Sequence, residues 1–495
     1  MKLMRLGLVT VVALALVGLA SVWSGRPGPE PAAVEQVPIP AVRTGEALPA
    51  TWYCAAGTAS RALTHYVFLS NPTGDAATVR VTGYTAGGAT PTQTVEVSPK
   101  GPLPLDVGAV LGDPTASVLV ESDVAGLVVD NQLSDEDAGD RAACARSSSD
   151  AWHFPVLSTT RDAGARLTLF NPFPADAGVD IEIGLDTGTR VPASLAGLVV
   201  PAGTARVVDL GQAVQRRDQF TAVVRSRSGR VVAAVAQTFD GSIGPEGLWL
   251  VNGVPGPQRR WAFAGGFSGT GVAERLMIQN PGDRRSRVLV QVTPYGGASD
   301  PPEPIEVAVE PRHYAVVDLS AETRIPGVGY HSIEVESDRP VVVARTTVLS
   351  AGPDPATDAG IAIRPALGRG VAVSTGTPVL SRSWTVPSIN AGADPAPVVA
   401  VHNPGEGIAR VTLEVVAAGS STALPGATDL EVAPGDSVVV PLGPAVAPEV
   451  AIVVTSSEPV AVERITVYAP DVDLAFDPAV PGHGRNRPLV ALGSS

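Results

Sequence analysis

The sequence is poor in aromatic residues and in lysine, and each shortage bears on function. Aromatic residues make up 4% of the 495 residues, and the only lysines are Lys2 and Lys100. The formal net charge is −14 and the isoelectric point is about 4.9. A chain this acidic does not bind nucleic acid or an anionic lipid surface through a basic patch. We therefore expect no nucleic-acid partner.

The short motifs of common catalytic chemistry are also missing. The sequence contains no GxSxG, no HExxH, no GxxxxGK[ST] and no CxxC. The run Gly269-Thr270-Gly271 begins like a nucleotide-binding loop but continues without a third glycine. The six histidines fall at unrelated positions, which is typical of solvated or locally bonded side chains. We therefore predict no catalytic residue, no cofactor and no enzyme activity.

One acidic segment, Asp135-Glu136-Asp137-Ala138-Gly139-Asp140, leaves two interpretations open. Alternating carboxylates before a glycine can ligate Ca²⁺ through oxygen, although the twelve-residue EF-hand pattern is incomplete. A solvated acidic loop accounts for the same residues without a ligand. The loop is the simpler interpretation, and the sequence assigns no metal site.

What the sequence does contain is an internal repeat. Four tryptophans are each followed, 19 residues later, by an Asn-Pro pair, with a period of 100 to 123 residues. The four sets are Trp52 with Asn71-Pro72, Trp152 with Asn171-Pro172, Trp261 with Asn280-Pro281, and Trp384 with Asn403-Pro404. A spacing kept four times indicates four structural units, each long enough to bury its own core.

Aliphatic residues around each Asn-Pro pair have the phase of β-strands. Positions −4, −2, +8 and +10 from each Asn are aliphatic in every repeat, and a spacing of two places both residues of a pair on one face. The sixteen residues are Val67, Leu69, Val79, Val81, Leu167, Leu169, Val179, Ile181, Leu276, Ile278, Val288, Val290, Val399, Val401, Val411 and Leu413. Further valine-rich runs and polar turns give about seven short strands per repeat, as in a β-sandwich. Propeller blades need only ~40–50 residues, so these repeats are too long for them.

The predicted fold is therefore all-β, with four tandem Ig-like β-sandwich modules after an N-terminal transmembrane or signal helix. The helix covers residues 1–25 and a proline-rich linker covers residues 26–50. The expected modules are residues 51–146, 151–247, 258–352 and 380–470, followed by a C-terminal tail at 471–495. The relative orientation of the modules does not follow from the sequence.

The N-terminal segment also predicts where the protein resides. Lys2 and Arg5 precede an uncharged run from Leu6 to Gly25, an arrangement that places the following chain outside the cytoplasm. The run is long enough to span a bilayer, while Gly18-Leu19-Ala20 is a weak signal-peptidase site. We favour an uncleaved single-pass anchor in the cell membrane, with a secreted protein as the alternative.

The two cysteines, Cys54 and Cys144, both belong to the first repeat. Cys54 occupies the position that holds Phe154, Phe263 and Val386 in the other repeats, so its side chain should point into the core. One pair of cysteines in one repeat of an exported chain favours a disulfide over two free buried thiols. Such a bond would stabilise the first module by ~4–5 kcal/mol on the chain-entropy model.

The repeated Trp and Asn-Pro residues admit a structural role or a binding role. The residue before a proline is pushed to extended geometry, and an Asn side chain there can bond the loop backbone. Each Trp begins a strand with an apolar residue two positions later, which is typical of a core anchor. We interpret both sets as structural, and the tryptophans as core anchors instead of a glycan-binding stripe.

The whole pattern resembles a family of exported actinobacterial proteins known only as a domain of unknown function. The resemblance rests on the Trp, the strand ending in Asn-Pro, the following Val-x-Val, and a closing hairpin such as Pro459-Val460-Ala461-Val462-Glu463-Arg464. It covers the chain after the N-terminal segment, and it implies no activity, cofactor or functional residue.

We therefore expect a non-enzymatic, extracytoplasmic cell-envelope protein that acts as a scaffold or binding surface. One alternative is an accessory subunit of an envelope glycan-processing enzyme or transporter, which would give it a protein or glycan partner. Another is a hydrolase with its site at a module junction. A scaffold predicts absent or repeated sites, whereas an enzyme predicts one irregular cleft, and the least regular junction is residues 353–383.

Overall fold

A computed structural model describes residues 50–55, 63–135, 138–296, 301–350, 370–390, 397–417, 419–442, 448–468, 473–482 and 487–488. The chain divides into two units, Met1–Ala47 and Leu48–Ser495, and all described residues belong to the second. The predicted N-terminal helix lies outside them, as does the linker up to residue 49. No helix in the described ranges has the length and apolar character needed to span a membrane.

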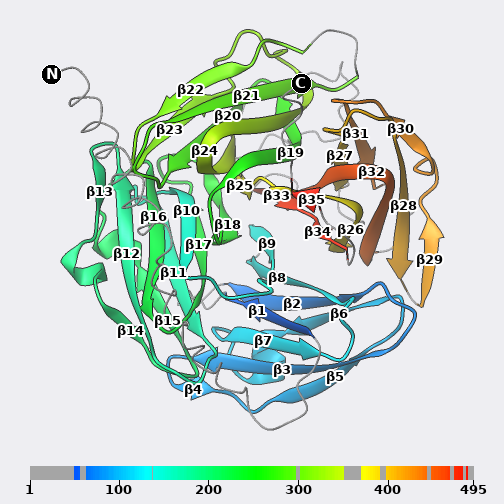
Figure 1. Ribbon diagram of the computed structural model, residues 1–495. Helices are drawn as coiled ribbons and strands as arrows, with labels where there is room; N and C mark the ends of the chain where they lie inside the picture. The colour runs from blue at the N-terminus through cyan, green and yellow to red at the C-terminus, as the bar shows by residue number, and fades with distance from the viewer. Residues whose placement is uncertain are drawn as a thin grey trace, which may run out of the picture. The chain divides into compact units, whose positions relative to one another are not determined.

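The regular secondary structure of the described residues is almost entirely β-strand (Figure 1). Module 1 contains β1 (Ala50–Cys54), β2 (Thr64–Asn71), β3 (Ala77–Thr85), β4 (Gly88–Ala89), β5 (Gln93–Val97), β6 (Gly101–Asp106), α2 (Val107–Leu111), β7 (Ser117–Ser122), β8 (Val128–Ser134) and β9 (Gly139–Ala143). Module 2 contains β10 (Ala151–Leu157), β11 (Ala163–Asn171), β12 (Ala177–Leu185), β13 (Gly188–Arg190), β14 (Leu198–Val200), β15 (Thr204–Asp209), β16 (Phe220–Ser228), β17 (Val232–Asp240) and β18 (Glu246–Asn252), with 3₁₀ turns at Ala193–Leu195 and Leu210–Gln212.

Modules 3 and 4 repeat this order. Module 3 contains β19 (Gln258–Ser268), β20 (Val272–Asn280), β21 (Ser286–Pro294), β22 (Ile305–Val309), β23 (His313–Asp318), β24 (Gly329–Leu349) and β25 (Val371–Thr375). Module 4 contains β26 (Val379–Asn390), β27 (Val398–His402), β28 (Ala409–Ala417), β29 (Ser420–Ala423), β30 (Leu430–Val432), β31 (Ser437–Pro441), β32 (Pro448–Tyr468), β33 (Asp473–Pro478), β34 (Val480–Pro481) and β35 (Arg487–Pro488).

Each module is built from two antiparallel sheets. The Trp sheet holds the strand with the repeated Trp and runs β1-β7-β3, β10-β16-β12, β19-β24-β21 and β26-β32-β28 in modules 1 to 4. The Asn-Pro sheet holds the strand that leads to the repeated Asn and runs β6-β2-β8-β9, β15-β11-β17-β18, β23-β20-β24-β25 and β31-β27-β32-β33. The prediction that the protein is all-β and sandwich-like is confirmed.

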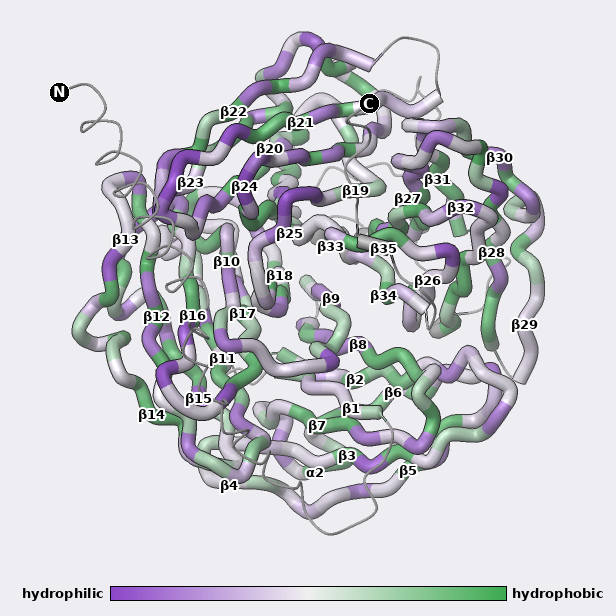
Figure 2. Tube along the Cα trace, in the orientation of Figure 1, coloured by the Kyte–Doolittle hydropathy of each residue, from purple (hydrophilic) through white to green (hydrophobic). Residues whose placement is uncertain are grey.

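The sixteen aliphatic residues chosen from the sequence form the centre of the four cores. Each is at most 1% exposed, and each core cluster combines residues of both sheets. Hydrophobic and hydrophilic residues alternate along strands such as β12 (Figure 2), where every second residue faces the core. The two-residue period thus correctly identified the buried face of the strands.

Two features differ from the simple picture of repeated hairpins. In modules 3 and 4 a single strand, β24 or β32, passes through both sheets, where modules 1 and 2 use separate strands. The Asn-Pro sheets also continue past the expected module ends, because β18 reaches Asn252, β25 begins at Val371 and β33 begins at Asp473. Each of these is the fourth strand of its sheet.

Candidate functional site

The fourth strands of the Asn-Pro sheets meet at one place. Each of β9, β18, β25 and β33 lies at the edge of its sheet. Contacts join β9 to β18, β18 to β25, β25 to β33, and β33 back to β9. The four modules therefore form a closed cycle of contacts around these four edge strands (Figure 1).

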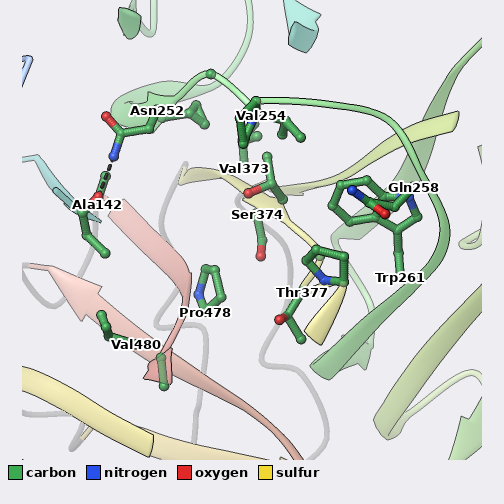
Figure 3. A pocket seen from close by; sticks show the side chains of 18 of the residues that line it. Ala142, Asn252, Val254, Gln258, Trp261, Val373, Ser374, Thr377, Pro478 and Val480 are labelled. Carbon is green, nitrogen blue, oxygen red and sulfur yellow. Dashed lines mark hydrogen bonds between the residues drawn. The ribbon is translucent and has the colours of Figure 1, made fainter. Parts of the chain in front are cut away.

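A pocket of about 400 Å³ lies among these edge strands and takes its walls from all four modules (Figure 3). Its lining consists of residues 141–143 from module 1, 250–256 from module 2, 258, 261 and 373–378 from module 3, and 478–481 from module 4. The volume is within the range of small-molecule binding sites. The pocket exists only in the assembled unit, since each module supplies a single part of the wall.

The wall is mainly aliphatic, with valines and prolines from three of the modules, including Val254, Val373, Pro478 and Val480 (Figure 3). Among the described lining residues there is no His, Cys, Asp or Glu. The charged lining residue, Arg141, is 7% exposed and its guanidinium lies 4.3 Å from the centre of the Phe68 ring.

Polar side chains in the wall tie neighbouring modules together. The Asn252 amide of module 2 donates a hydrogen bond to the carbonyl of Ala143 in module 1 (Figure 3). The Ser374 hydroxyl of module 3 donates to Oε1 of Glu463 in module 4 at 2.6 Å. The pocket wall is therefore connected to the charged groups buried between modules 3 and 4.

Two buried acid–arginine pairs join neighbouring modules at equivalent positions. Arg345 Nη2 of module 3 lies 2.8 Å from Glu463 Oε1 of module 4, and Arg464 Nη1 of module 4 lies 3.4 Å from Asp130 Oδ2 of module 1. All four side chains are at most 3% exposed. The two arginines pair in register with the residue four before the repeated Asn, namely Leu276 and Val399.

The other two joints of the cycle have no acid–arginine pair at these positions. At the equivalent positions module 2 has Val235 instead of arginine, and modules 2 and 3 have Ala234 and Ala344 instead of the acid. Modules 1 and 2 meet through Leu63, Leu133, Ala236, Leu248 and Leu250, and modules 2 and 3 meet through Val156, Trp249, Met277, Ala344, Val371 and Val373. The cycle thus has two joints with an acid–arginine pair and two joints with hydrophobic clusters.

The joint between modules 3 and 4 contains further titratable groups. Glu274 lies 2.5 Å from His331 Nε2 and 3.4 Å from Arg345 Nε, so two carboxylates surround one guanidinium. Burial raises the pKa of Glu463 above its usual range, and the Glu274 charge adds to the increase, while Arg345 opposes it. Burial also raises the pKa of the Tyr295 phenol, whose hydroxyl donates to the Ala264 carbonyl.

The predicted repeat residues are buried inside the modules. Trp52, Trp152, Trp261 and Trp384 are at most 2% exposed, and the last three donate their indole N–H to the carbonyls of Val231, Val341 and Val460. Arg146 lies 5.0 Å from the ring of Trp52. Trp261 is the one of the four that also lines the described part of the pocket. These four tryptophans therefore form no exposed stripe of indole rings in the described structure.

The four Asn side chains make one set of contacts four times. Asn71, Asn171, Asn280 and Asn403 each accept from the backbone N–H two residues later and donate to the carbonyl four residues later. Each also donates to the carbonyl of the valine that ends a later strand, Val97 in β5, Val200 in β14, Val309 in β22 or Val432 in β30. The prolines Pro72, Pro172, Pro281 and Pro404 come directly after these residues. Each Asn side chain thus closes its own loop and connects this loop to the end of β5, β14, β22 or β30.

Cys54 and Cys144 form a disulfide, as predicted, with a Cα–Cα distance of 4.7 Å. The bond joins β1 to the segment that follows β9, at a sequence separation of 90. Backbone bonds between Tyr53 and Ala145 lie directly beside it. The disulfide therefore connects the two sheets of module 1.

The acidic segment is only partly described, because Glu136 and Asp137 lie outside the described residues. The Asp135 carboxylate accepts from Ala138 N–H, and Asp140 accepts from Leu250 N–H of module 2 at 2.6 Å. Asp135 also lines a second pocket, of about 460 Å³, between modules 1 and 2. In the described ranges, no three His, Cys, Asp or Glu side chains are grouped to hold a metal ion.

Sequence reasoning did not find the pocket. It placed the irregular junction at residues 353–383. Residues 353–369 of this segment lie outside the described residues, but residues 373–378, from β25 and the turn after it, line the pocket. One feature of the sequence could have indicated these pocket-lining segments, namely a further strand that follows the closing hairpin of every repeat. The four strands are Gly139–Ala143, Glu246–Asn252, Val371–Thr375 and Asp473–Pro478.

Sequence comparison assigns the chain to a family. The model of DUF5719, a family of unknown function, matches residues 137–377 and 363–492, well over half of the chain. The chain belongs to this family. Membership in DUF5719 brings no known activity or ligand. A comparison with curated proteins gives no match to this DUF5719 chain.

Solved structures give short or distant similarities to this DUF5719 chain. Thermotoga maritima 1070 is 21% identical over 24% of this chain and 94% of its own, with a TM-score of 0.20. The Anabaena sensory rhodopsin transducer is 24% identical over 18% and 92%, with a TM-score of 0.16. A glycoside hydrolase family 32 structure from Bifidobacterium adolescentis is 11% identical over 88% and 99%, with a TM-score of 0.13. Similarities at this level carry no functional argument.

Proposed function

We propose that this protein is a non-enzymatic, extracytoplasmic binding protein of the cell envelope, in which four Ig-like modules frame one central pocket. The proposal includes a single membrane-spanning N-terminal segment and an exported body. In this proposal the four modules act as a scaffold that positions the four edge strands, and the pocket between these strands binds the ligand.

The observation that carries this proposal is that every module contributes one edge strand to the wall of one pocket. A spacer built from independent modules needs no such convergence. The described lining is aliphatic and contains no carboxylate or imidazole, the groups that general acid–base catalysis most often uses. These features favour binding over turnover.

Two further observations support the exported location. The disulfide of module 1 is of the kind that persists in oxidising compartments. The N-terminal pattern of Lys2, Arg5 and an uncharged run is typical of a segment that directs the following chain across a membrane. An accessory role beside an envelope glycan-processing enzyme or transporter is compatible with the same location.

One contact favours a hydrolase as the second candidate. Ser374 lies in the pocket wall, and its hydroxyl donates to the Glu463 carboxylate. A serine beside a carboxylate with a raised pKa is a possible nucleophile and base. However, Arg345 and the Gly265 N–H also bind this carboxylate, and Ser374 is only 2% exposed, so its hydroxyl has little surface with which to meet a substrate.

Small-molecule recovery tests the proposal directly. The full chain is purified from its native envelope, and bound molecules are released and identified by mass spectrometry. We expect a defined molecule from the native protein and its loss in Val480→Trp, which places an indole in the pocket. The matched control is Ile408→Trp, because Ile408 is an exposed apolar residue of the same module outside the lining. Equal recovery from both variants would contradict the proposal, and a product that requires Ser374 would favour the hydrolase.

A further inference from the structure

The shape and composition of the pocket limit the size of its ligand. A volume of about 400 Å³ accommodates a small molecule or one short apolar chain. Partly exposed Val251, Pro378, Pro478 and Val480 face this space from modules 2, 3 and 4. Apolar surface of this kind gains most from burying a hydrocarbon body.

The charges around the pocket select against an ionised ligand. Among the described lining residues there is no acid to balance a cation. The guanidinium of Arg141 packs on Phe68, and Arg141 has little exposed surface with which to meet an anion. The chain carries a net charge of −14, which further disfavours anions. Burying an uncompensated charge in an apolar site is costly, so the occupant should be uncharged.

Module 3 still offers uncharged hydrogen-bonding groups to this space. Thr375 is a half-buried lining residue with a hydroxyl, and Gln258 is an exposed lining residue with an amide. A ligand hydroxyl or amide can therefore form a hydrogen bond with Thr375 without leaving the pocket.

We propose that the pocket binds a small uncharged molecule with an apolar body and at least one hydroxyl or amide group. The inference rests on the proposed binding function and names the ligand class for the same site. The apolar body packs against the valines and prolines of the wall. The hydroxyl or amide bonds to the Thr375 side chain.

Three eight-carbon probes with different head groups test the ligand class. The full chain is titrated with n-octanol, octanoate and octylammonium by isothermal titration calorimetry. We expect n-octanol to bind, and the two ions to bind at least tenfold more weakly, because the pocket offers neither of them a counter-charge. Thr375→Val keeps the side-chain shape and should weaken n-octanol binding about fivefold by removing one hydrogen bond.

Two variants show whether binding occurs in the pocket. Val480→Trp should abolish n-octanol binding, whereas Val480→Ala, which enlarges the pocket, and Ile408→Trp, outside it, should retain binding. Melting curves check that each variant is folded. If Val480→Trp does not fold, the weaker n-octanol binding of Thr375→Val is the test of the site. Tighter binding of octanoate or octylammonium at the same pocket would overturn the ligand class but leave the binding function intact. Absence of binding by all three probes, or binding unaffected by both Val480→Trp and Thr375→Val, would overturn both.

Discussion

The position of the disulfide shows how one site in the repeat is filled in different ways. The register of the Trp strands makes Cys144 equivalent to Gly253 in module 2 and to Gly376 in module 3. A side-chain carbon on Gly253 would lie 2.9 Å from the Phe154 ring, and one on Gly376 would lie 2.8 Å from the Phe263 ring. Modules 2 and 3 therefore pair a large residue with glycine where module 1 pairs two cysteines.

This equivalence predicts which cysteine substitutions are tolerated. Cys54→Phe alone should place a ring against the Cys144 side chain and lose the disulfide, with overpacking that costs about 1–3 kcal/mol. The double variant Cys54→Phe with Cys144→Gly copies modules 2 and 3 and should melt at a higher temperature than Cys54→Phe. Thermal melts of both, beside Cys54→Ala with Cys144→Ala, measure this. A double variant no more stable than Cys54→Phe would contradict the equivalence of the sites.

Two buried histidines predict how stability depends on pH. Burial lowers the pKa of His153 to about 4, with the Arg225 charge contributing, and burial also lowers the pKa of His65 to about 4. The unfolded chain binds these protons near pH 6.5, before the folded protein does. Stability should therefore fall as the pH drops from about 6.5 to about 4, by about 3 kcal/mol for each histidine.

His153→Thr separates this contribution from that of the carboxyl groups. Module 4 has Thr385 at the equivalent position, so threonine fits the repeat. The variant should keep most of its stability at pH 7 and lose less stability than the native chain between pH 6.5 and 4. Chemical unfolding at a series of pH values measures the difference. Identical pH profiles for the two proteins would show that His153 does not take up this proton on unfolding.

At the scale of strands and sheets, the fourth strand completes each Asn-Pro sheet. The fragment 151–247 contains the expected module 2 but lacks nearly all of β18, which would leave β17 as an open edge. We expect the fragment 148–256 to be β-rich and to melt several degrees higher than 151–247, because it retains the β17–β18 pairing. Circular dichroism melts of both fragments test this. Equal melting temperatures would mean that β18 needs its neighbouring modules to pair.

The sequence predicted the strands that repeat with clear alternation and missed what depends on distant contacts. Val67, Leu69 and their equivalents revealed the buried faces because alternation is a local property. The fourth strands pack against other modules on one face, so Leu250 and Trp249 are both buried and the alternation is lost. The pocket could not be predicted for the same reason, since its walls come from segments more than 300 residues apart. The disulfide was predictable because the chain has only two cysteines.

At the scale of the whole second unit, the cycle closes through Arg464 and Asp130. At the equivalent positions, module 2 has Val235, which lies in its core, and module 3 has Ala344, which lies in the hydrophobic joint between modules 2 and 3. A buried ion pair is replaceable by apolar residues only when both partners change, because a single change leaves one charge buried alone. Replacing Arg464 by valine and Asp130 by alanine together would therefore give the closing joint residues that the repeat already has at these positions.

A double-mutant cycle tests this joint. Arg464→Val alone and Asp130→Ala alone should each destabilise the protein by about 3–5 kcal/mol. The double variant should recover much of the larger loss, because it leaves no unpaired charge buried and copies the residues that modules 2 and 3 have at these positions. Urea unfolding of the four proteins gives the coupling free energy. Strictly additive losses would show that the two side chains do not interact across the joint.

The distance along the chain between Asp130 and Arg464, 334 residues, has a consequence in time. During synthesis the first module emerges long before the last. Its Asp130 side chain therefore remains exposed to solvent until the fourth module has folded. The closing contact is then the last of the four joints to form, and it carries the largest loop-closure entropy of the set. Until that moment the protein is an open chain of domains with no central pocket. Under the proposed function, a ligand can therefore bind only after the fourth module has folded, because residues 478–481 complete the pocket wall.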